Sequence, residues 1–225
     1  MTRLAGVALT PALEDYLESL LAPRDAVMAR LEGEYESNNV PAVGPFVGAL
    51  LLLLARTARA VRMLELGTAT GYSGAWLLRS SPEARLVTLE LDPRRAAEAR
   101  RNLTELELAE RADVVERDAL EFMRADAGRY DLVFNDLLNS FPSEEAVREC
   151  FRLSLERLRP GGLLIADNAL RRGEVLHPQG QGAQNVVLWN RLVADDARLD
   201  STLIPLRDGV SVARVRDQIM KKDGS

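Results

Sequence analysis

Residues 61–74 constrain this chain more than any other part of the sequence. They begin as a short apolar run, V-R-M-L-E-L, which is typical of a buried β-strand. The run breaks at Gly67 and Gly71, and residues 72–78 then have the pattern of the first turns of a helix. Glycines let a ligand approach the backbone closely, and a helix offers free amide groups at its N-terminus. The sequence therefore predicts a strand, a turn and a helix, with a nucleotide-type ligand site at the turn.

The glycine spacing distinguishes this turn from the dinucleotide-binding fingerprint. That fingerprint requires G-x-G-x-x-G, and here Ala69 occupies the place of its second glycine. Glu65, inside the strand end, would repel a pyrophosphate but would attract an ammonium group or a ribose hydroxyl. The turn therefore favours S-adenosylmethionine, which carries an amino acid and a sulfonium but no phosphate. An ordinary strand-to-helix turn without a ligand is the alternative.

Composition narrows the class of protein. The chain has 225 residues, of which 47% are hydrophobic and 28% charged, and this fits one α/β domain with a substantial core. Its net charge is −5 with no basic block, so capture of DNA is not indicated, although a local patch could still recognise a tRNA loop. The only cysteine, Cys150, excludes an internal disulfide, and we expect it in the core of a cytoplasmic protein. The apolar run at residues 50–54 is too short to span a membrane.

A regular alternation of strands and helices is predicted after the glycine turn, which is typical of a parallel sheet with helices on both faces. The last two strands, 199–205 and 210–216, are separated by only four residues, so they should form an antiparallel hairpin. Residues 1–40 contain two predicted helices, at 12–21 and 24–35, which could cover the site as a lid. We therefore expect one domain over residues 1–225, an α/β, Rossmann-like, doubly wound sheet of seven strands that is mostly parallel.

Polar side chains follow the predicted carboxyl ends of the strands, where ligands bind in open parallel sheets. Glu90 closes the second strand, where an acidic residue typically binds ribose hydroxyls, and Asp118 and Ala119 follow the third, where we expect the adenine. Clustered carboxylates repel one another unless a cation or hydrogen-bond donors lie among them. Taken singly, each carboxylate could instead cap the next helix.

Three oxygen donors, Asp136, Asp167 and Asn168, end two strands that should be neighbours. Such a set suits a hard cation such as Mg²⁺, or alternatively Mn²⁺ or Ca²⁺, with water or substrate completing the coordination. An Asp-Asn turn with a helix cap is the alternative. His177, the only histidine, should be a surface residue of the following loop rather than a ligand or base.

From about residue 41 to residue 216, the sequence resembles the metal-dependent O-methyltransferases related to catechol and caffeoyl-coenzyme A O-methyltransferases. The likeness rests on L-E-L-G-T-A-T-G-Y-S, T-L-E-L-D-P, R-D-A-L-E, Y-D-L-V-F-N-D, R-P-G-G-L-L-I-A-D-N-A-L-R-R-G-E-V and P-L-R-D-G-V. The resemblance implies S-adenosylmethionine as cofactor, Asp136, Asp167 and Asn168 as metal ligands, and a homodimer. It places at the cofactor the residues Val43 (through its backbone), Glu65, Gly67, Thr68, Ser73, Glu90 and Ala119.

One departure from the family pattern concerns the general base. The family usually has D-x-x-K after the fourth strand, whereas here Asn139 follows Asp136, Leu137 and Leu138. Asparagine can orient a hydroxyl but cannot take its proton, and a general base is typically worth about 10²–10⁴-fold in rate. A bound cation could compensate by lowering the hydroxyl pKa. Leu137 and Leu138 indicate an apolar substrate wall or a substrate unlike catechol.

Together these features predict methyl transfer to a hydroxyl of a small hydroxylated aromatic, a vicinal diphenol, with Asp136 and Asn139 as catalytic residues. Two alternatives stay open. One is methylation of a hydroxylated tRNA nucleoside, which some relatives perform. The other is a silent module that holds S-adenosylmethionine without turnover, because Asn139 replaces the lysine. A nicotinamide dehydrogenase is disfavoured by Ala69 and by the terminal hairpin.

Overall fold

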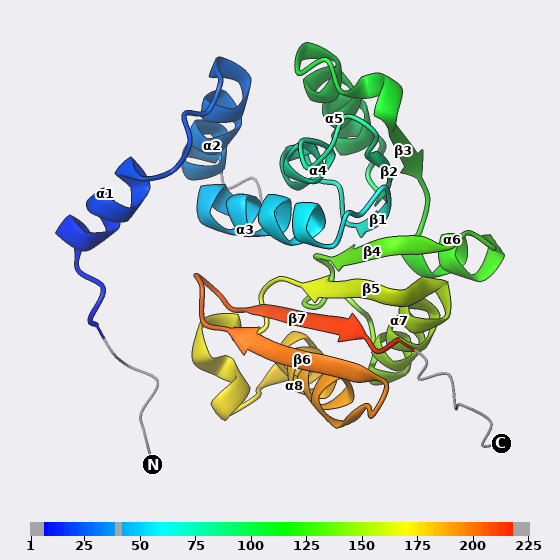
Figure 1. Cartoon of the computed structure of the whole chain (residues 1–225). Helices are drawn as coiled ribbons and strands as arrows, with labels where there is room; N and C mark the ends of the chain where they lie inside the picture. The colour runs from blue at the N-terminus through cyan, green and yellow to red at the C-terminus, as the bar shows by residue number, and fades with distance from the viewer. Residues whose placement is uncertain (1–6, 39–41, 218–225) are drawn as a thin grey trace, which may run out of the picture.

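A seven-stranded sheet forms the centre of the computed structural model, which describes residues 7–38 and 42–217 (Figure 1). Its strands follow the order β3-β2-β1-β4-β5-β7-β6. The five strands β1 to β5 run parallel, and β7 lies antiparallel to both β5 and β6. The strands are β1 (Arg62–Leu66), β2 (Arg85–Glu90), β3 (Ala112–Glu116), β4 (Tyr130–Asn135), β5 (Leu158–Ala166), β6 (Leu199–Ile204) and β7 (Val210–Val215). The predicted doubly wound sheet with its terminal antiparallel hairpin is confirmed.

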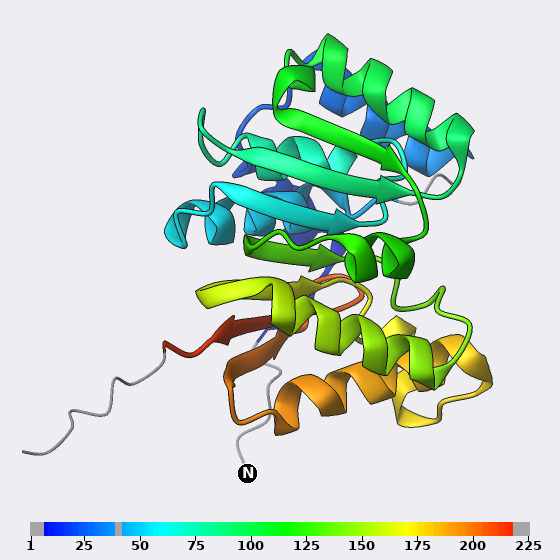
Figure 2. The same cartoon turned by 90° about the vertical axis from the view of Figure 1, so that its right-hand side faces the viewer.

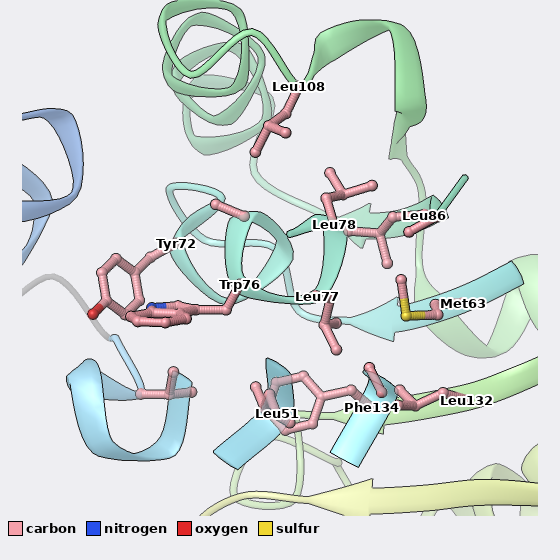
Figure 3. Close-up of a cluster of buried hydrophobic side chains, with 14 of the residues drawn as sticks. Leu51, Met63, Tyr72, Trp76, Leu77, Leu78, Leu86, Leu108, Leu132 and Phe134 are labelled. Carbon is pink, nitrogen blue, oxygen red and sulfur yellow. The ribbon is translucent and has the colours of Figure 1, made fainter. Parts of the chain in front are cut away.

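Helices cover both faces of the sheet (Figure 2). One face carries α3 (Gly44–Thr57), α4 (Tyr72–Leu78) and α5 (Pro93–Glu105), and the other carries α6 (Ala119–Ala125), α7 (Glu144–Arg157) and α8 (Gly180–Asp195). Because side chains alternate along a strand, each strand supplies both layers. Met63 belongs to the buried cluster under α3 and α4, and its neighbour Leu64 belongs to the cluster under α7 and α8. Figure 3 shows the first of these clusters, in which Met63 and Phe134 of the sheet lie beneath the α4 side chains.

Two helices precede the sheet, α1 (Pro11–Ser19) and α2 (Ala26–Asn38). Thr10 caps α1 as predicted, because its hydroxyl accepts a hydrogen bond from Leu13 N at 3.3 Å. α1 buries no residue and lies apart from the sheet in Figure 1. α2 is attached to the body, since its Arg30 donates to Asn102 Oδ1 of α5 at 3.0 Å. That these helices cover the site stays a prediction, because residues 1–6 and 39–41 lie outside the described residues.

Several predicted boundaries were wrong. The sequence R-P-G-G at residues 159–162 indicates a turn before the fifth strand, but β5 already begins at Leu158. The extra residues are absorbed as an irregularity, because Leu158 pairs with Tyr130 while Leu163 pairs with Leu132. α3 begins at Gly44 rather than at residue 46, since proline is well tolerated in the first turn of a helix.

Two short 3₁₀ helices complete the secondary structure, η1 (Ala109–Arg111) and η2 (Arg171–Leu176). The second of them occupies part of the region predicted as a polar loop, and α8 begins three residues earlier than the predicted 183. Within the ranges that the structure describes, no helix is long and apolar enough to cross a bilayer.

Candidate active site

The order in which the strands are added to the sheet reverses between β1 and β4. From β1 it proceeds to β2 and β3 at one edge, and from β4 to β5 and the hairpin at the other. Such a switch point leaves a crevice at the carboxyl ends of the two strands, where ligands bind in this class of fold. Glu65 lies near the end of β1, and Asp136 follows β4 directly. Asp136 N donates to Leu66 O at 2.9 Å, which joins the two strand ends.

The glycine turn after β1 is built from left-handed backbone conformations. Gly67, Ala69 and Gly71 have φ values of 97°, 45° and 86°. The left-handed region costs a non-glycine residue about 1–2 kcal/mol, so Ala69 is held there by its surroundings. A Cβ at Gly67 would come within 3.1 Å of the Leu137 side chain from the loop after β4. Glycine at this position therefore provides both the conformation and the close approach of two strand ends.

Glu65 is fully buried at the base of the turn. Its Oε2 accepts a hydrogen bond from Thr88 Oγ1 at 2.6 Å, and Thr88 Oγ1 lies 2.5 Å from Thr68 Oγ1. Burial raises the pKa of Glu65 from 4.5 to about 7, although hydrogen bonds from Ser73 and Thr88 oppose the shift. Its Oε1 has no hydrogen-bond partner in the described part of the chain. A donor on a ligand would satisfy this oxygen, because a buried acceptor without a partner is unfavourable.

Glu90 fastens the glycine turn to the end of β2. Its Oε2 accepts from Ala69 N at 2.9 Å, and its Oε1 accepts from Leu91 N and Asp92 N at 2.9 and 3.0 Å. Asp118 caps α6 instead of lining an open surface, because its Oδ1 accepts from the first amides of that helix. Asp118 therefore caps a helix, and its contact with the cofactor stays a prediction. Ala119 is buried in the first turn of α6.

A second group of polar residues lies across the switch point, after β4 and β5. Asp167 is 4% exposed, and burial raises its pKa to about 6. The pKa of Asp136 lies well above its usual range, because burial and the charges of Asp167 and Glu65 disfavour its ionised form. The positive charge of Arg207 opposes both of these upward shifts in pKa. These carboxyl groups are therefore close enough to repel one another, and a cation between them would relieve that repulsion.

Asn139 belongs to the same group. Its Nδ2 donates to Asn168 Oδ1 at 3.3 Å, and Asn168 has a left-handed backbone with φ 61°, which asparagine tolerates better than most residues. Two buried oxygens here, Asn139 Oδ1 and Asp167 Oδ1, have no hydrogen-bond partner among the described residues. We call Asp136, Asn139, Asp167 and Asn168 the oxygen cluster.

The oxygen cluster fits a hard divalent cation by the chemistry of its donors. Over residues 7–38 and 42–217, no group of three or more His, Cys, Asp or Glu side chains could hold a metal ion. The oxygen cluster instead combines two carboxylates with two amides, and amide oxygens are also ligands of Mg²⁺ and Ca²⁺. Asp167 Oδ1, which is buried and has no partner among the described residues, is an acceptor that a cation would engage.

Other predicted residues have different surroundings. Leu138 is 1% exposed and belongs to the core under α7, so it does not form a substrate wall, whereas Leu137 is half-buried beside Gly67. His177 is exposed, as predicted. Cys150 is buried in the core, as predicted, and burial raises the pKa of its thiol to about 12.

One residue near the oxygen cluster was missed by the sequence analysis. Arg207 lies in the turn between β6 and β7, and its guanidinium donates to Ala42 O at 3.1 Å and to Val43 O. Val43 itself is buried and stands at the start of α3. The contact joins residues 164 positions apart, so no local pattern could reveal it.

A cavity of about 580 Å³ lies beside Arg207, between the N-terminal helices and the β6–β7 turn. Its walls are mostly apolar and include Leu9, Leu17, Phe46 and Pro205. Cavities of this size hold small organic ligands.

Comparison with known proteins connects these features to one family. A family model described as O-methyltransferase matches residues 26–216. The catechol O-methyltransferase of Niastella koreensis is 31% identical over 222 residues, covering 91% of this chain and 97% of the relative. The catechol O-methyltransferase of Mycobacterium tuberculosis is 32% identical over 217 residues, covering 92% and 96%.

Solved structures show the same likeness. The O-methyltransferase TomG from Streptomyces achromogenes, involved in tomaymycin synthesis and determined with S-adenosylmethionine, has a TM-score of 0.79 at 30% identity, covering 91% of this chain and 96% of its own. An O-methyltransferase from Bacillus cereus in complex with S-adenosylhomocysteine has a TM-score of 0.78 at 29% identity, covering 91% and 97%.

Proposed function

Because the chain belongs to the O-methyltransferase family, we propose that it transfers the methyl group of S-adenosylmethionine to a hydroxyl of a small vicinal diphenol. Two relatives named catechol O-methyltransferase and a neighbour determined with S-adenosylmethionine support this assignment. The observation that carries it is the oxygen cluster, whose buried oxygens without partners lie across the switch point from the glycine turn.

On the cofactor side, the chain would hold S-adenosylmethionine in the glycine turn. Glu65 Oε1, buried and without a partner, would accept a hydrogen bond from the cofactor. Glu90 already accepts three backbone hydrogen bonds, but a carboxylate has room for about four, so it can still bind a ribose hydroxyl. The bound cofactor supplies an activated methyl group on its sulfonium. Val43 and Ser73 would complete this side.

On the acceptor side, Asp136, Asp167 and Asn168 would hold a divalent cation such as Mg²⁺. A bound cation lowers the pKa of a coordinated hydroxyl and fixes its position. Asn139 Oδ1 would accept a hydrogen bond from the acceptor hydroxyl and orient it; the amide cannot take the proton, which would pass to solvent water. Most of the rate gain would then come from positioning. Leu137 would contact the acceptor ring.

A methyl-transfer assay tests the proposal. Labelled S-adenosylmethionine is incubated with catechol-type diphenols, and the O-methylated product is identified by mass spectrometry. We expect a singly methylated diphenol. A monophenol lacks the second oxygen for the cation and serves as the matched control substrate.

A silent module is the second candidate, and Asn139 is the observation that favours it. Calorimetry with S-adenosylmethionine, followed by incubation of labelled cofactor with cell extract, separates the alternatives. Binding without labelled product would favour the silent module. Label in the RNA fraction would instead support methylation of a tRNA nucleoside.

We also propose that the chain forms a homodimer. Large apolar side chains are exposed on the N-terminal segment and on α3, among them Leu9, Leu20 and Leu53 at 66%, 64% and 59%. A contiguous patch of such side chains would favour association. Light scattering of the purified protein gives the mass in solution, and a monomer mass would contradict the proposal.

A further inference from the structure

The turn between β6 and β7, residues 205–209, contacts the segment that follows the oxygen cluster. Leu170 N donates to Asp208 O at 2.7 Å, and Ala169 N donates to Gly209 O at 2.9 Å. Asp208 Oδ1 accepts a further hydrogen bond from Arg172 N. These donors begin one residue after Asn168. The turn is therefore fixed to the chain that carries two members of the oxygen cluster.

The same turn reaches the start of α3 through Arg207. The guanidinium donates to the carbonyl oxygens of Ala42 and Val43. It also lies so close to Gly44 that a Cβ there would stand 2.7 Å from its Nη1. Gly44 has φ 72°, so glycine suits this position both because of the backbone conformation and because a side chain would clash with Arg207. Arg207 is thus the contact by which the turn holds residues 42–44.

Arg207 makes this contact although its own backbone conformation is unfavourable for a residue with a side chain. Its φ of 49° lies in the left-handed region, which favours glycine. Such conformations persist when the surrounding structure over-determines them, and they concentrate at functional sites. Glycine would relax the backbone here but would remove both hydrogen bonds to residues 42 and 43.

We propose that Arg207 is a positioning residue for the cofactor. It holds residues 42–44 against the β6–β7 turn and so fixes the cofactor-binding loop relative to the oxygen cluster. This inference rests on the proposed function, because it assigns Val43 to S-adenosylmethionine. Without Arg207, the cofactor has to order residues 42–44 itself. The apparent affinity for the cofactor is then reduced in proportion to the fraction of molecules in which these residues hold the binding conformation.

Arg207→Gly tests the proposal, with Arg59→Gly as its matched control. Arg59 is also an arginine in the left-handed region, with φ 52°, but it follows α3 at the opposite end of that helix. The control therefore reports relief of backbone strain alone. Calorimetry with S-adenosylhomocysteine should show a Kd about tenfold weaker for Arg207→Gly, because residues 42–44 would then hold the binding conformation in only about a tenth of the molecules. The Kd of Arg59→Gly should stay within about twofold of wild type.

Four further readouts separate positioning from a general effect on folding. The melting temperature of Arg207→Gly should fall by only a few degrees, since glycine relieves the left-handed backbone and so offsets part of the stability lost with the two hydrogen bonds. In the protein without cofactor, amides of residues 42–50 should exchange hydrogen faster in Arg207→Gly than in Arg59→Gly. Arg207→Lys should recover part of the affinity, and the KM for S-adenosylmethionine should rise more than kcat falls.

The outcomes distinguish this inference from the proposed function. If wild type binds S-adenosylhomocysteine and Arg207→Gly binds it equally well, the inference is overturned and the proposed function stands. Equal weakening in both glycine variants would also overturn it. If wild type binds no S-adenosylhomocysteine, the proposed function fails, and this inference fails with it.

Discussion

The two sides of the crevice differ in how completely the protein satisfies its own polar groups. On the glycine-turn side, Glu90 accepts three backbone hydrogen bonds and Asp118 accepts two. Across the switch point, Asp167 Oδ1 and Asn139 Oδ1 are buried without a partner in the described residues. Buried acceptors are normally paired. The comparison indicates that the turn is largely built in advance and leaves Glu65 Oε1 for a ligand, whereas the oxygen cluster leaves two such oxygens.

Raised carboxyl pKa values occur on both sides of the crevice. Burial and neighbouring charge hold the pKa of Asp136 well above its usual range, and burial raises that of Asp167 to about 6. On the glycine-turn side, burial raises the pKa of Glu65 to about 7. A ligand that donates to Glu65 and a cation among the aspartates would both stabilise ionised forms that burial disfavours.

The largest effect should come from breaking the oxygen cluster. Asp167→Asn keeps the shape of the side chain but removes a charge, so a cation loses an anionic ligand. Because such a cation is worth several kcal/mol to the reaction, methyl transfer should fall roughly 10³-fold. Affinity for S-adenosylhomocysteine should change less than about threefold. Asp113 is an exposed aspartate in β3, and Asp113→Asn serves as the control. Full activity in Asp167→Asn would contradict the proposal that the oxygen cluster needs a cation.

A smaller effect concerns pH and stability through Glu65. Its folded pKa of about 7 exceeds its ordinary 4.5, so between these values the folded protein binds more protons than the unfolded chain. The free energy of unfolding should therefore fall as pH rises from 4.5 through 7 and level off above 7. Glu65→Gln removes this loss and should be more stable than wild type at pH 8 by up to about 3 kcal/mol.

Urea unfolding of both proteins without cofactor, at pH 5 and pH 8, measures the difference. The gap between variant and wild type should widen with pH. A gap that is the same at both pH values would show that Glu65 ionises as easily in the fold as in the unfolded chain.

The smallest effect should come from Asn139→Ala. This variant removes the hydrogen bond to Asn168 and the oxygen that orients the acceptor, so kcat should fall about tenfold, as expected for the loss of one or two hydrogen bonds. Steady-state kinetics with a diphenol measures it. A variant as active as wild type would show that Asn139 does not orient the hydroxyl.

The fold and much of the candidate site could be predicted because strand ends are local signals. Glu65, Asp136 and Asp167 each follow an apolar run, and parallel pairing brings such ends to one edge of the sheet. Strand pairing also explains why β5 begins earlier than the sequence predicts. The R-P-G-G segment forms an irregularity inside β5, because Leu158 before it and Leu163 after it both pair with β4.

Other features depend on contacts between distant parts of the chain. Leu138 and its neighbour Leu137 look alike in the sequence, yet the packing of α7 buries one of them and leaves the other at the crevice. The contact of Arg207 with Val43 needs the hairpin to fold against the start of α3. Local patterns carry no information about either arrangement.

The most direct test of the central claim is methyl transfer to catechol measured before and after removal of divalent cations. Chelation should abolish the reaction, and restoring Mg²⁺ should recover it in wild type but not in Asp167→Asn. Affinity for S-adenosylhomocysteine should change little throughout. Methyl transfer that continues at the full rate in protein shown to be metal-free would contradict the account.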